Sequence, residues 1–448
     1  KTSEPSTLNY LLLNLIYSIL LDADKSDVVV KDEQVYTSRT AIPQSLVDKF
    51  KNNCNFPLSS INTLRNKAYN EVLSWEIDTK QRIYSLNLPT GLGKTLTSLS
   101  FALKLRERLN NNHRIIYCLP FLSIIDQNFS VFERVLEVNG IEPTSDIILK
   151  HHHLSDIRYE HSKFVSNSYS ETDQTSTTDW ARILIEGWNA EIIVTTFVQF
   201  FHTLVSYHNR CLRKFHRLVN SIIILDEVQS IPIKFWLLTR KLLLDLTSEF
   251  NSYVILVTAT QPLIFEPGEI KNLCNHRPYF EALNRIKIIP RVQVPTTLDE
   301  LAVQFNLEEK THLFIFNTIS SAKSFYNKLI EENLVHKSDI TFLSAHIIPK
   351  IRRERIEKIK SKDYKVVVTT QLVEAGVDID FDVVVRDIAP LDSIIQSAGR
   401  CNRNADKQGE VFVYTLVENN KRFANYIYDK VLLDITESIL KSKNHIYE

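Results

Sequence analysis

One continuous stretch, Ile83–Thr97, limits what this chain can fold into more than any other part of it. Its sequence, IYSLNLPTGLGKTLT, passes from an apolar run typical of a strand, through a turn with two glycines, to a helix-forming run. This order predicts a strand, a loop and a helix, and the backbone N–H groups of such a loop can surround the phosphates of a nucleotide. Lys94 would neutralise phosphate charge, and the Thr95 hydroxyl would hold Mg²⁺.

The predicted phosphate loop departs from the usual pattern at its first position, where Leu88 stands in place of glycine. The residues predicted to contact the nucleotide are Leu88, Pro89, Thr90, Gly91, Leu92, Gly93, Lys94 and Thr95. The alternative is a strand–turn–helix corner in which a threonine caps the helix and no ligand binds. Other parts of the chain must decide between the two interpretations.

Strand-like and helix-like patterns alternate along most of the chain. Ser221–Leu225 is a continuous apolar run, as expected for a strand that is buried on both faces of a parallel sheet. A second set of alternating strands and helices runs from His312 to Thr415. We therefore predict an α/β fold with two parallel sheets, each flanked by helices.

The order of these patterns also predicts how the chain is divided. Residues 286–300 contain two prolines and interrupt the alternation, so they are interpreted as an inter-domain linker. The predicted organisation is a helical N-terminal segment with a linker at 1–52, a first domain at 53–288, a linker at 289–300, a second domain at 301–420 and a helical C-terminal tail at 421–448.

Composition excludes several classes of protein. The formal net charge of the 448 residues is zero, so any nucleic-acid binding must come from a local groove rather than from a basic surface overall. Five scattered cysteines form no CxxC pair, which argues against a zinc site or a disulfide framework and favours a reducing, cytoplasmic location. No apolar run is long enough to span a bilayer, so no membrane partner is expected.

An acidic pair, Asp226-Glu227, follows the apolar run of residues 221–225. The carboxyl end of a buried strand is where α/β sheets bind ligands, so Asp226 would hold Mg²⁺ and Glu227 would orient and deprotonate the attacking water. The alternative is a solvent-exposed acidic loop. Thr258 and Thr260 end a later strand of the same domain, where they could sense the Asp226 site through Gln229.

Two arginines in the segment QSAGRCNR (residues 396–403) are the third candidate element. Arg400 and Arg403 are three residues apart, which places them on the same side if the segment is helical, and a guanidinium can stabilise charge on a phosphoryl group. The alternative is a basic, solvated turn. Upstream, Gly376 allows close backbone approach and Asp378 could reach a ribose hydroxyl.

Three consecutive histidines, His151-His152-His153, are interpreted as part of a surface loop. Consecutive residues cannot easily converge on one metal ion, and no carboxylate or cysteine pattern accompanies them. The apolar-poor stretch Ser155–Thr178 is likewise predicted to be a surface insertion.

The phosphate loop, the acidic pair, the threonines at 258 and 260, the segment with Gly376 and Asp378, and the arginine segment follow one another along the chain in an order that resembles a superfamily 2 helicase. The strings LPTGLGKT, YCLPFLSIIDQ, VTTFVQFFHT, LDEVQSIP and APLDSIIQSAGRCNRN are narrower and resemble the CRISPR-associated helicase–nuclease of type I interference systems. The resemblance implies two tandem RecA-like domains that use ATP and Mg²⁺ to move 3′ to 5′ on single-stranded DNA and unwind it. It also implies recruitment to a DNA-bound CRISPR surveillance complex and a metal-dependent nuclease domain.

The same resemblance assigns roles to individual residues. It makes Lys94 and Thr95 contacts to nucleotide and Mg²⁺, Asp226 and Glu227 the metal-binding and catalytic acids, Asp378 a ribose contact, and Arg400 with Arg403 the arginine fingers. These fingers would act when the second domain closes on the nucleotide held by the first.

The chain also departs from the family pattern. It contains no His-Asp dipeptide, although Asp22 stands where the final metal ligand of the nuclease domain would be. Residues 1–52 therefore resemble a remnant of that domain, and no nuclease activity is expected from this chain alone. The nuclease would be provided in cis or by a separate chain. Helicases often have arginine at the position of Ser397, and we expect this change to tune the site.

Two alternatives to this function stay open on the sequence. One is an ATP-dependent RNA helicase of the DEAD-type group. Gln229 and the family-specific strings argue against it. The other is a nucleotide-gated scaffold that binds partners without ATP turnover. The presence of Lys94, Glu227, Arg400 and Arg403 argues against it.

Overall fold

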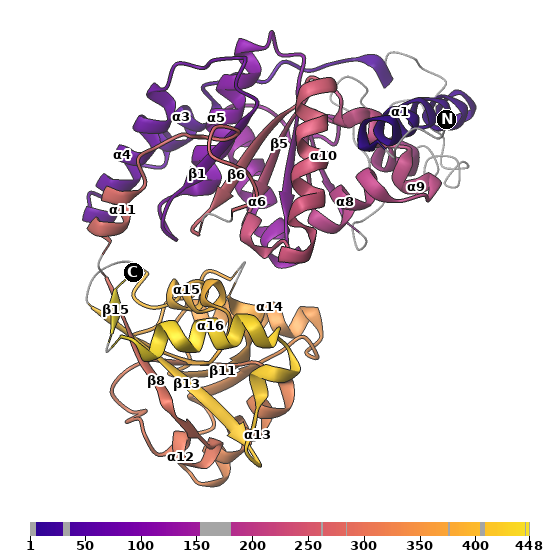
Figure 1. Ribbon diagram of the computed structural model, residues 1–448. Coiled ribbons are helices and arrows are strands. Elements are labelled where there is room, and N and C mark those ends of the chain that lie inside the picture. Colours follow the sequence, from indigo (N-terminus) through magenta and orange to yellow (C-terminus); the bar gives the residue numbers. More distant parts are fainter. Residues whose placement is uncertain are drawn as a thin grey trace, which may run out of the picture. The chain divides into compact units, whose positions relative to one another are not determined.

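The computed structural model describes residues 6–29, 36–152, 181–260, 263–283, 285–374, 377–403, 408–443 and 445–447. They form two compact α/β units (Figure 1). The first contains the described chain up to Asn275 except Pro89–Gly91, and the second contains Pro89–Gly91 and the described chain from His276 on. The stretch Ser155–Thr178, predicted to be a surface insertion, lies outside the described residues. None of the helices within the described ranges is long and apolar enough to cross a membrane.

The first unit is built on a parallel sheet with strand order β3-β4-β2-β5-β6-β1-β7. Its central strands are buried along their whole length, which explains the continuous apolar runs in the sequence. The strands are β1 (Ile83–Asn87), β2 (Arg114–Leu119), β3 (Ile148–His151), β4 (Ile192–Thr196), β5 (Ser221–Asp226), β6 (Tyr253–Thr258) and β7 (Lys271–Asn272).

Helices cover both faces of this sheet. The helices α5 (Lys94–Arg108) and α6 (Leu122–Val138) pack on one face, whereas α8 (Phe197–Val205) and α10 (Trp236–Glu249) pack on the other. Further helical segments are α1 (Thr7–Val29), α3 (Leu46–Asn53), α4 (Ser60–Ser74), α9 (Asn209–Leu212) and the short 3₁₀ turns η1 (Phe215–Leu218), η2 (Val228–Ser230) and η3 (Ile233–Phe235).

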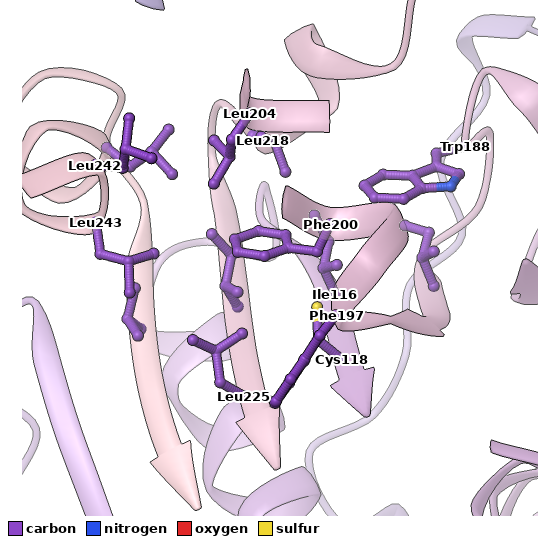
Figure 2. Packing of buried hydrophobic residues seen from close by; sticks show 14 of the residues in the cluster. Ile116, Cys118, Trp188, Phe197, Phe200, Leu204, Leu218, Leu225, Leu242 and Leu243 are labelled. Atoms are coloured by element: carbon purple, nitrogen blue, oxygen red, sulfur yellow. The ribbon is translucent and has the colours of Figure 1, made fainter. Parts of the chain in front are cut away.

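A large hydrophobic core of this unit lies between the sheet and helices α8 and α10. Figure 2 shows Phe197, Phe200 and Leu204 of α8 together with side chains from the strands. Ile116 and Cys118 of β2 point into this core, so Tyr117 between them points to the opposite face of the sheet.

Helix α1 packs on the first unit through Leu11, which is buried in the hydrophobic core, and through polar contacts. Ser18 Oγ donates to Arg213 O at 2.9 Å, and Asp22 forms a buried ion pair of 2.7 Å with Arg213 Nε. Asp22, which the family resemblance matched to a metal ligand, is therefore engaged by an arginine in this structure.

The second unit has a sheet with strand order β10-β11-β9-β12-β13-β8-β15, in which all pairs are parallel except β8 with β15. A short strand β14 also pairs antiparallel with β13. The strands are β8 (Ile286–Thr296), β9 (His312–Phe316), β10 (Ile340–Leu343), β11 (Val366–Thr370), β12 (Val383–Asp387), β13 (Gly409–Glu418), β14 (Lys421–Arg422) and β15 (Ile446–Tyr447).

Two hydrophobic clusters lie on the two faces of the second sheet. One includes Leu301 and Phe325 from α12 and α13, and the other includes Ile394 and Leu440 from α15 and α16. The helical segments are α11 (Arg277–Ala282), α12 (Leu298–Ala302), α13 (Ile319–Glu331), α14 (Pro349–Lys360), α15 (Leu391–Ala398), α16 (Lys430–Lys441) and the 3₁₀ turns η4 (Gln371–Val373) and η5 (Phe423–Tyr426).

The predicted α/β fold with two parallel sheets is confirmed, but the predicted linkers are not linkers in the structure. Most of residues 289–300 belongs to strand β8 and helix α12. Pro290 is accommodated because β8 pairs with β15 only at Lys287 and Ile288, so no strand of the described chain needs its missing N–H on that side. Within the N-terminal 1–52, α3 buries Leu46 and Phe50, and in the C-terminal tail α16 packs on β8.

Candidate active site

The candidate phosphate loop connects β1 to α5 in the first unit. Gly91 has φ of +85° and Gly93 has φ of +77°, so both positions use a backbone conformation that favours glycine. Gly93 is the N-cap residue of α5, and no side chain caps this helix N-terminus. The first backbone N–H groups of this helix are therefore available to an anion.

The packing of Leu88 explains why the loop has leucine where the usual pattern has glycine. Its side chain is fully buried, and its N–H donates to Thr258 O at 3.2 Å. This residue thus packs the loop onto the end of β6, and its N–H is already used within the protein. Leu92, four residues later in the loop, is also buried.

Lys94 has the environment expected of a group that binds an anion. Its side chain is only 8% exposed, and its Nζ has no hydrogen-bond partner among the described residues. The nearest charged group is Oε1 of Glu227, at 4.0 Å. Because a buried ammonium group without hydrogen bonds is unfavourable, this position fits a negatively charged ligand.

Asp226 ends β5 and lies in a dry environment. Oδ2 accepts a hydrogen bond from the hydroxyl of Tyr117 at 2.8 Å, and Oδ1 accepts one from the N–H of Glu227 at 2.9 Å. Burial, followed by the neighbouring charge of Glu227, raises the pKa of Asp226 to about 7, while Lys94 acts in the opposite direction. A cation beside Asp226 would favour its ionised form.

The residues present fit a magnesium ion that arrives with a nucleotide. No group of three or more His, Cys, Asp or Glu side chains in the described ranges could hold a metal ion by itself. Mg²⁺ is commonly bound by one or two carboxylates together with phosphate oxygens and water, so Asp226 and the Thr95 hydroxyl are a sufficient protein contribution.

Glu227 is held in an unusual conformation. Its φ of 57° lies in the left-handed region, which a glutamate rarely adopts. The N–H and hydroxyl of Ser230 both donate to Glu227 O, at 3.0 and 2.8 Å. Gln229 donates to Glu227 Oε2 at 2.6 Å and accepts from Thr258 Oγ1 at 2.7 Å. The predicted connection from Thr258 to the acidic pair through Gln229 is therefore present.

The two arginines of the second unit do not lie on one helix face, which corrects the sequence-based expectation. Helix α15 ends at Ala398, and the segment after it pairs with Phe381 in an isolated bridge. Arg400 donates to Val373 O at 2.9 Å and to Glu374 O at 2.6 Å.

Arg403 takes a different partner. Its Nη1 lies 3.0 Å from Oδ1 of Asp378, and its N–H donates to Asp380 Oδ1 at 2.7 Å. The carboxylate of Asp378 is about half exposed, and its predicted ribose contact stays a prediction. Gly376 lies outside the described residues.

Sequence reasoning missed a buried polar network behind these arginines. Arg386 in β12 pairs with Glu374 Oε1 at 2.7 Å, and the hydroxyls of Ser393 and Ser397 on α15 both donate to the same carboxylate. Arg386 also donates to Asn317 Oδ1 at 2.6 Å. The signal available in the sequence was an arginine inside the apolar run VVVRD.

Ser397, which stands where helicases often have arginine, is fully buried in this network. The interpretation of the three histidines as a surface loop was wrong for His151. This residue ends strand β3, is buried, and accepts a hydrogen bond of 3.1 Å from the indole N–H of Trp188. His153 lies outside the described residues.

Two family models match the chain. The model described as CRISPR-associated nuclease/helicase Cas3, C-terminal, matches residues 308–406. The model described as Type III restriction enzyme, res subunit, matches residues 44–262. The first match lies within the second unit, and the other match lies in the first unit apart from Pro89–Gly91.

Two relatives described as CRISPR-associated nuclease/helicase Cas3 are similar to most of the chain. The relative from Haloferax volcanii is 30% identical over 75% of this chain and 46% of its own length. The relative from Methanothermobacter thermautotrophicus is 27% identical over 79% of this chain and 42% of its own length. The chain thus spans about half the length of the relatives it matches.

Solved structures show the same fold. The crystal structure of T. fusca Cas3 with AMPPNP has a TM-score of 0.69 at 19% identity, covering 96% of this chain and 53% of that chain. The DUF1998 helicase MrfA bound to DNA has a TM-score of 0.55 at 16% identity, covering 91% and 55%. The two units are therefore tandem RecA-like domains.

Proposed function

We propose that this chain, which carries the two helicase domains of the Cas3 family, moves 3′ to 5′ along single-stranded DNA and unwinds target DNA in CRISPR type I interference. The environment of Lys94 is the observation that supports the ATP dependence of this activity most strongly. Its buried ammonium has no hydrogen-bond partner in the described part of the chain and faces the acidic pair. A nucleotide phosphate would supply the missing negative charge.

The first unit would bind and hydrolyse ATP. The loop of residues 89–93 and the N-terminus of α5 would hold the phosphates, while Lys94 neutralises their charge. Bound Mg²⁺ would withdraw negative charge from the phosphates, and Thr95 and Asp226 are the residues that would hold it. Glu227 would orient the attacking water and accept its proton, with Gln229 fixing the direction of the carboxylate.

The second unit would contribute three charged residues to ATP hydrolysis. Arg400 and Arg403 would stabilise the negative charge that develops on the transferred phosphoryl group, and Asp378 would contact the ribose. In the structure, the side chain of Arg400 is bound to two backbone carbonyls and that of Arg403 to Asp378. Both arginines would exchange these contacts for the nucleotide.

The partners of such a helicase would be single-stranded DNA and the CRISPR surveillance complex that recruits it. A nuclease domain, in cis or on a separate chain, would degrade the unwound strand, and we expect no nuclease activity from residues 1–448 alone. Contacts to the DNA backbone rather than to bases would make movement independent of sequence.

A strand-displacement experiment tests this proposal. Duplexes with a 3′ single-stranded tail should be unwound in the presence of ATP, whereas duplexes with a 5′ tail should not. Glu227→Gln should abolish unwinding. Unwinding of RNA duplexes only would instead identify an RNA helicase. ATP turnover unchanged by Glu227→Gln would refute the catalytic assignment, and binding without turnover in the unmodified chain would identify a scaffold.

A further inference from the structure

A buried tyrosine lies between the phosphate-loop helix and the acidic pair. Tyr117 is at the centre of β2, directly opposite Ile224 of β5 in the parallel ladder. Residues two apart on a strand share a face, so Asp226 lies diagonally ahead of Tyr117 on the same face of the sheet. A tyrosine is long enough to span this diagonal, and its hydroxyl reaches Oδ2 of Asp226 at 2.8 Å.

The same hydroxyl contacts helix α5. Ser98 Oγ lies 3.3 Å from the Tyr117 hydroxyl, and Ser98 in turn donates to Thr95 O at 3.1 Å. Tyr117 is fully buried, and its ring packs edge-on against Phe132 with the ring centres 5.1 Å apart. Its hydroxyl therefore donates to Asp226 and lies beside Ser98, and the packed ring gives it little freedom to turn away from Asp226.

These contacts leave a defined part of Asp226 for a ligand. Each carboxylate oxygen already accepts one hydrogen bond, from Tyr117 at Oδ2 and from the Glu227 N–H at Oδ1. A carboxylate oxygen offers about two lone-pair directions, so one direction on each oxygen remains. Without the tyrosine hydroxyl, only the backbone of Glu227 would fix the rotation of this side chain.

We infer that Tyr117 is a positioning residue, which holds the Asp226 carboxylate in the orientation that binds the magnesium ion of the nucleotide complex. This inference rests on the proposed function, because it presupposes that the site binds magnesium with a nucleotide. In this assignment the tyrosine is not itself a metal ligand; it acts through Asp226, whose Oδ2 accepts its hydrogen bond. Partners that orient a metal ligand are commonly important for metal affinity, although they lie outside the metal's own contacts.

Tyr117→Phe tests the inference, since it removes the hydroxyl and keeps the ring that packs on Phe132. Tyr253→Phe is the matched control. Tyr253 is also a buried tyrosine in a central strand of this sheet, and its hydroxyl donates to Thr79 O at 2.9 Å, not to a site residue. Both variants therefore lose one buried hydroxyl donor.

The measurement is the affinity of a fluorescent ADP analogue as a function of Mg²⁺ concentration, with EDTA as the metal-free reference. For Tyr117→Phe we expect unchanged affinity in EDTA and a Mg²⁺ half-saturation raised about tenfold. For Tyr253→Phe we expect both values to match the unmodified chain. ATP turnover as a function of Mg²⁺ should follow the same pattern, with higher Mg²⁺ restoring much of the lost rate in Tyr117→Phe.

Two results would overturn this inference and leave the proposed function standing. One is an unchanged Mg²⁺ half-saturation in Tyr117→Phe, and the other is an equal shift in both variants, which would indicate a general loss of rigidity. If the unmodified chain shows no Mg²⁺-dependent nucleotide binding, the proposed function fails and the inference fails with it.

Discussion

The side-chain amide of Gln229 donates a hydrogen bond of 2.6 Å to Oε2 of Glu227. The oxygen of the same amide accepts a hydrogen bond of 2.7 Å from Thr258 at the end of β6. Because an amide has a donor end and an acceptor end, these two partners fix its orientation. Gln229 thus ties the acid assigned to water activation to the neighbouring strand.

Gln229→Ala should lower the turnover number of ATP hydrolysis about tenfold, because a hydrogen bond to a charged group contributes about 1.5–3 kcal/mol. Nucleotide affinity should change little, since Gln229 is not assigned to the phosphates. The control is Gln81→Ala, which removes a glutamine that donates to the backbone oxygens of Ile83 and Glu269. Equal turnover in Gln229→Ala and the unmodified chain would refute this role.

The buried ion pair of Arg386 and Glu374 in the second unit should be costly to break. Arg386→Met leaves a buried carboxylate without its cation and should lower the free energy of unfolding by about 3–5 kcal/mol. The control, Lys310→Met, breaks a largely exposed pair with Glu410 and should cost about 0–1 kcal/mol. Urea denaturation followed by far-ultraviolet circular dichroism measures the free energy of unfolding of both variants. Similar losses in the two variants would contradict the importance of this network.

Gly93 should be required for its backbone conformation rather than for lack of space. An added Cβ would meet no atom within 4 Å, but φ is +77°, which an alanine adopts at a cost of roughly 1 kcal/mol. Gly140→Ala is matched to Gly93→Ala, because its φ is +72° and its surroundings are equally open. Both variants should lose similar stability, whereas only Gly93→Ala should bind nucleotide more weakly in a fluorescence titration. Equal affinities would argue against the loop as the phosphate site.

The sequence predicted the features that depend on local pattern. Continuous apolar runs such as Ser221–Leu225 gave the parallel strands, and the position of Asp226 after such a run gave its place at the strand end. The two prolines of β8 were misleading, because whether a strand tolerates proline depends on which neighbours it has in the sheet. That information is tertiary and cannot be read from the residues themselves.

Tertiary contacts also explain what was missed in the site. Tyr117 and Arg386 lie in apolar strands, and only the folded sheet brings them to Asp226 and Glu374. The arginine spacing suggested a shared helix face, but the helix ends at Ala398 before Arg400 is reached. Spacing predicts a common direction only while the backbone stays helical.

The most direct test of the central claim is ATP hydrolysis stimulated by single-stranded DNA, measured with and without Lys94→Ala. Lys104→Ala is the control on the same helix; its ammonium donates to the backbone oxygens of Leu73 and Trp75. We predict that single-stranded DNA stimulates hydrolysis, that Lys94→Ala abolishes it and that Lys104→Ala retains it. Hydrolysis that persists in Lys94→Ala, or that single-stranded DNA does not stimulate, would contradict the account.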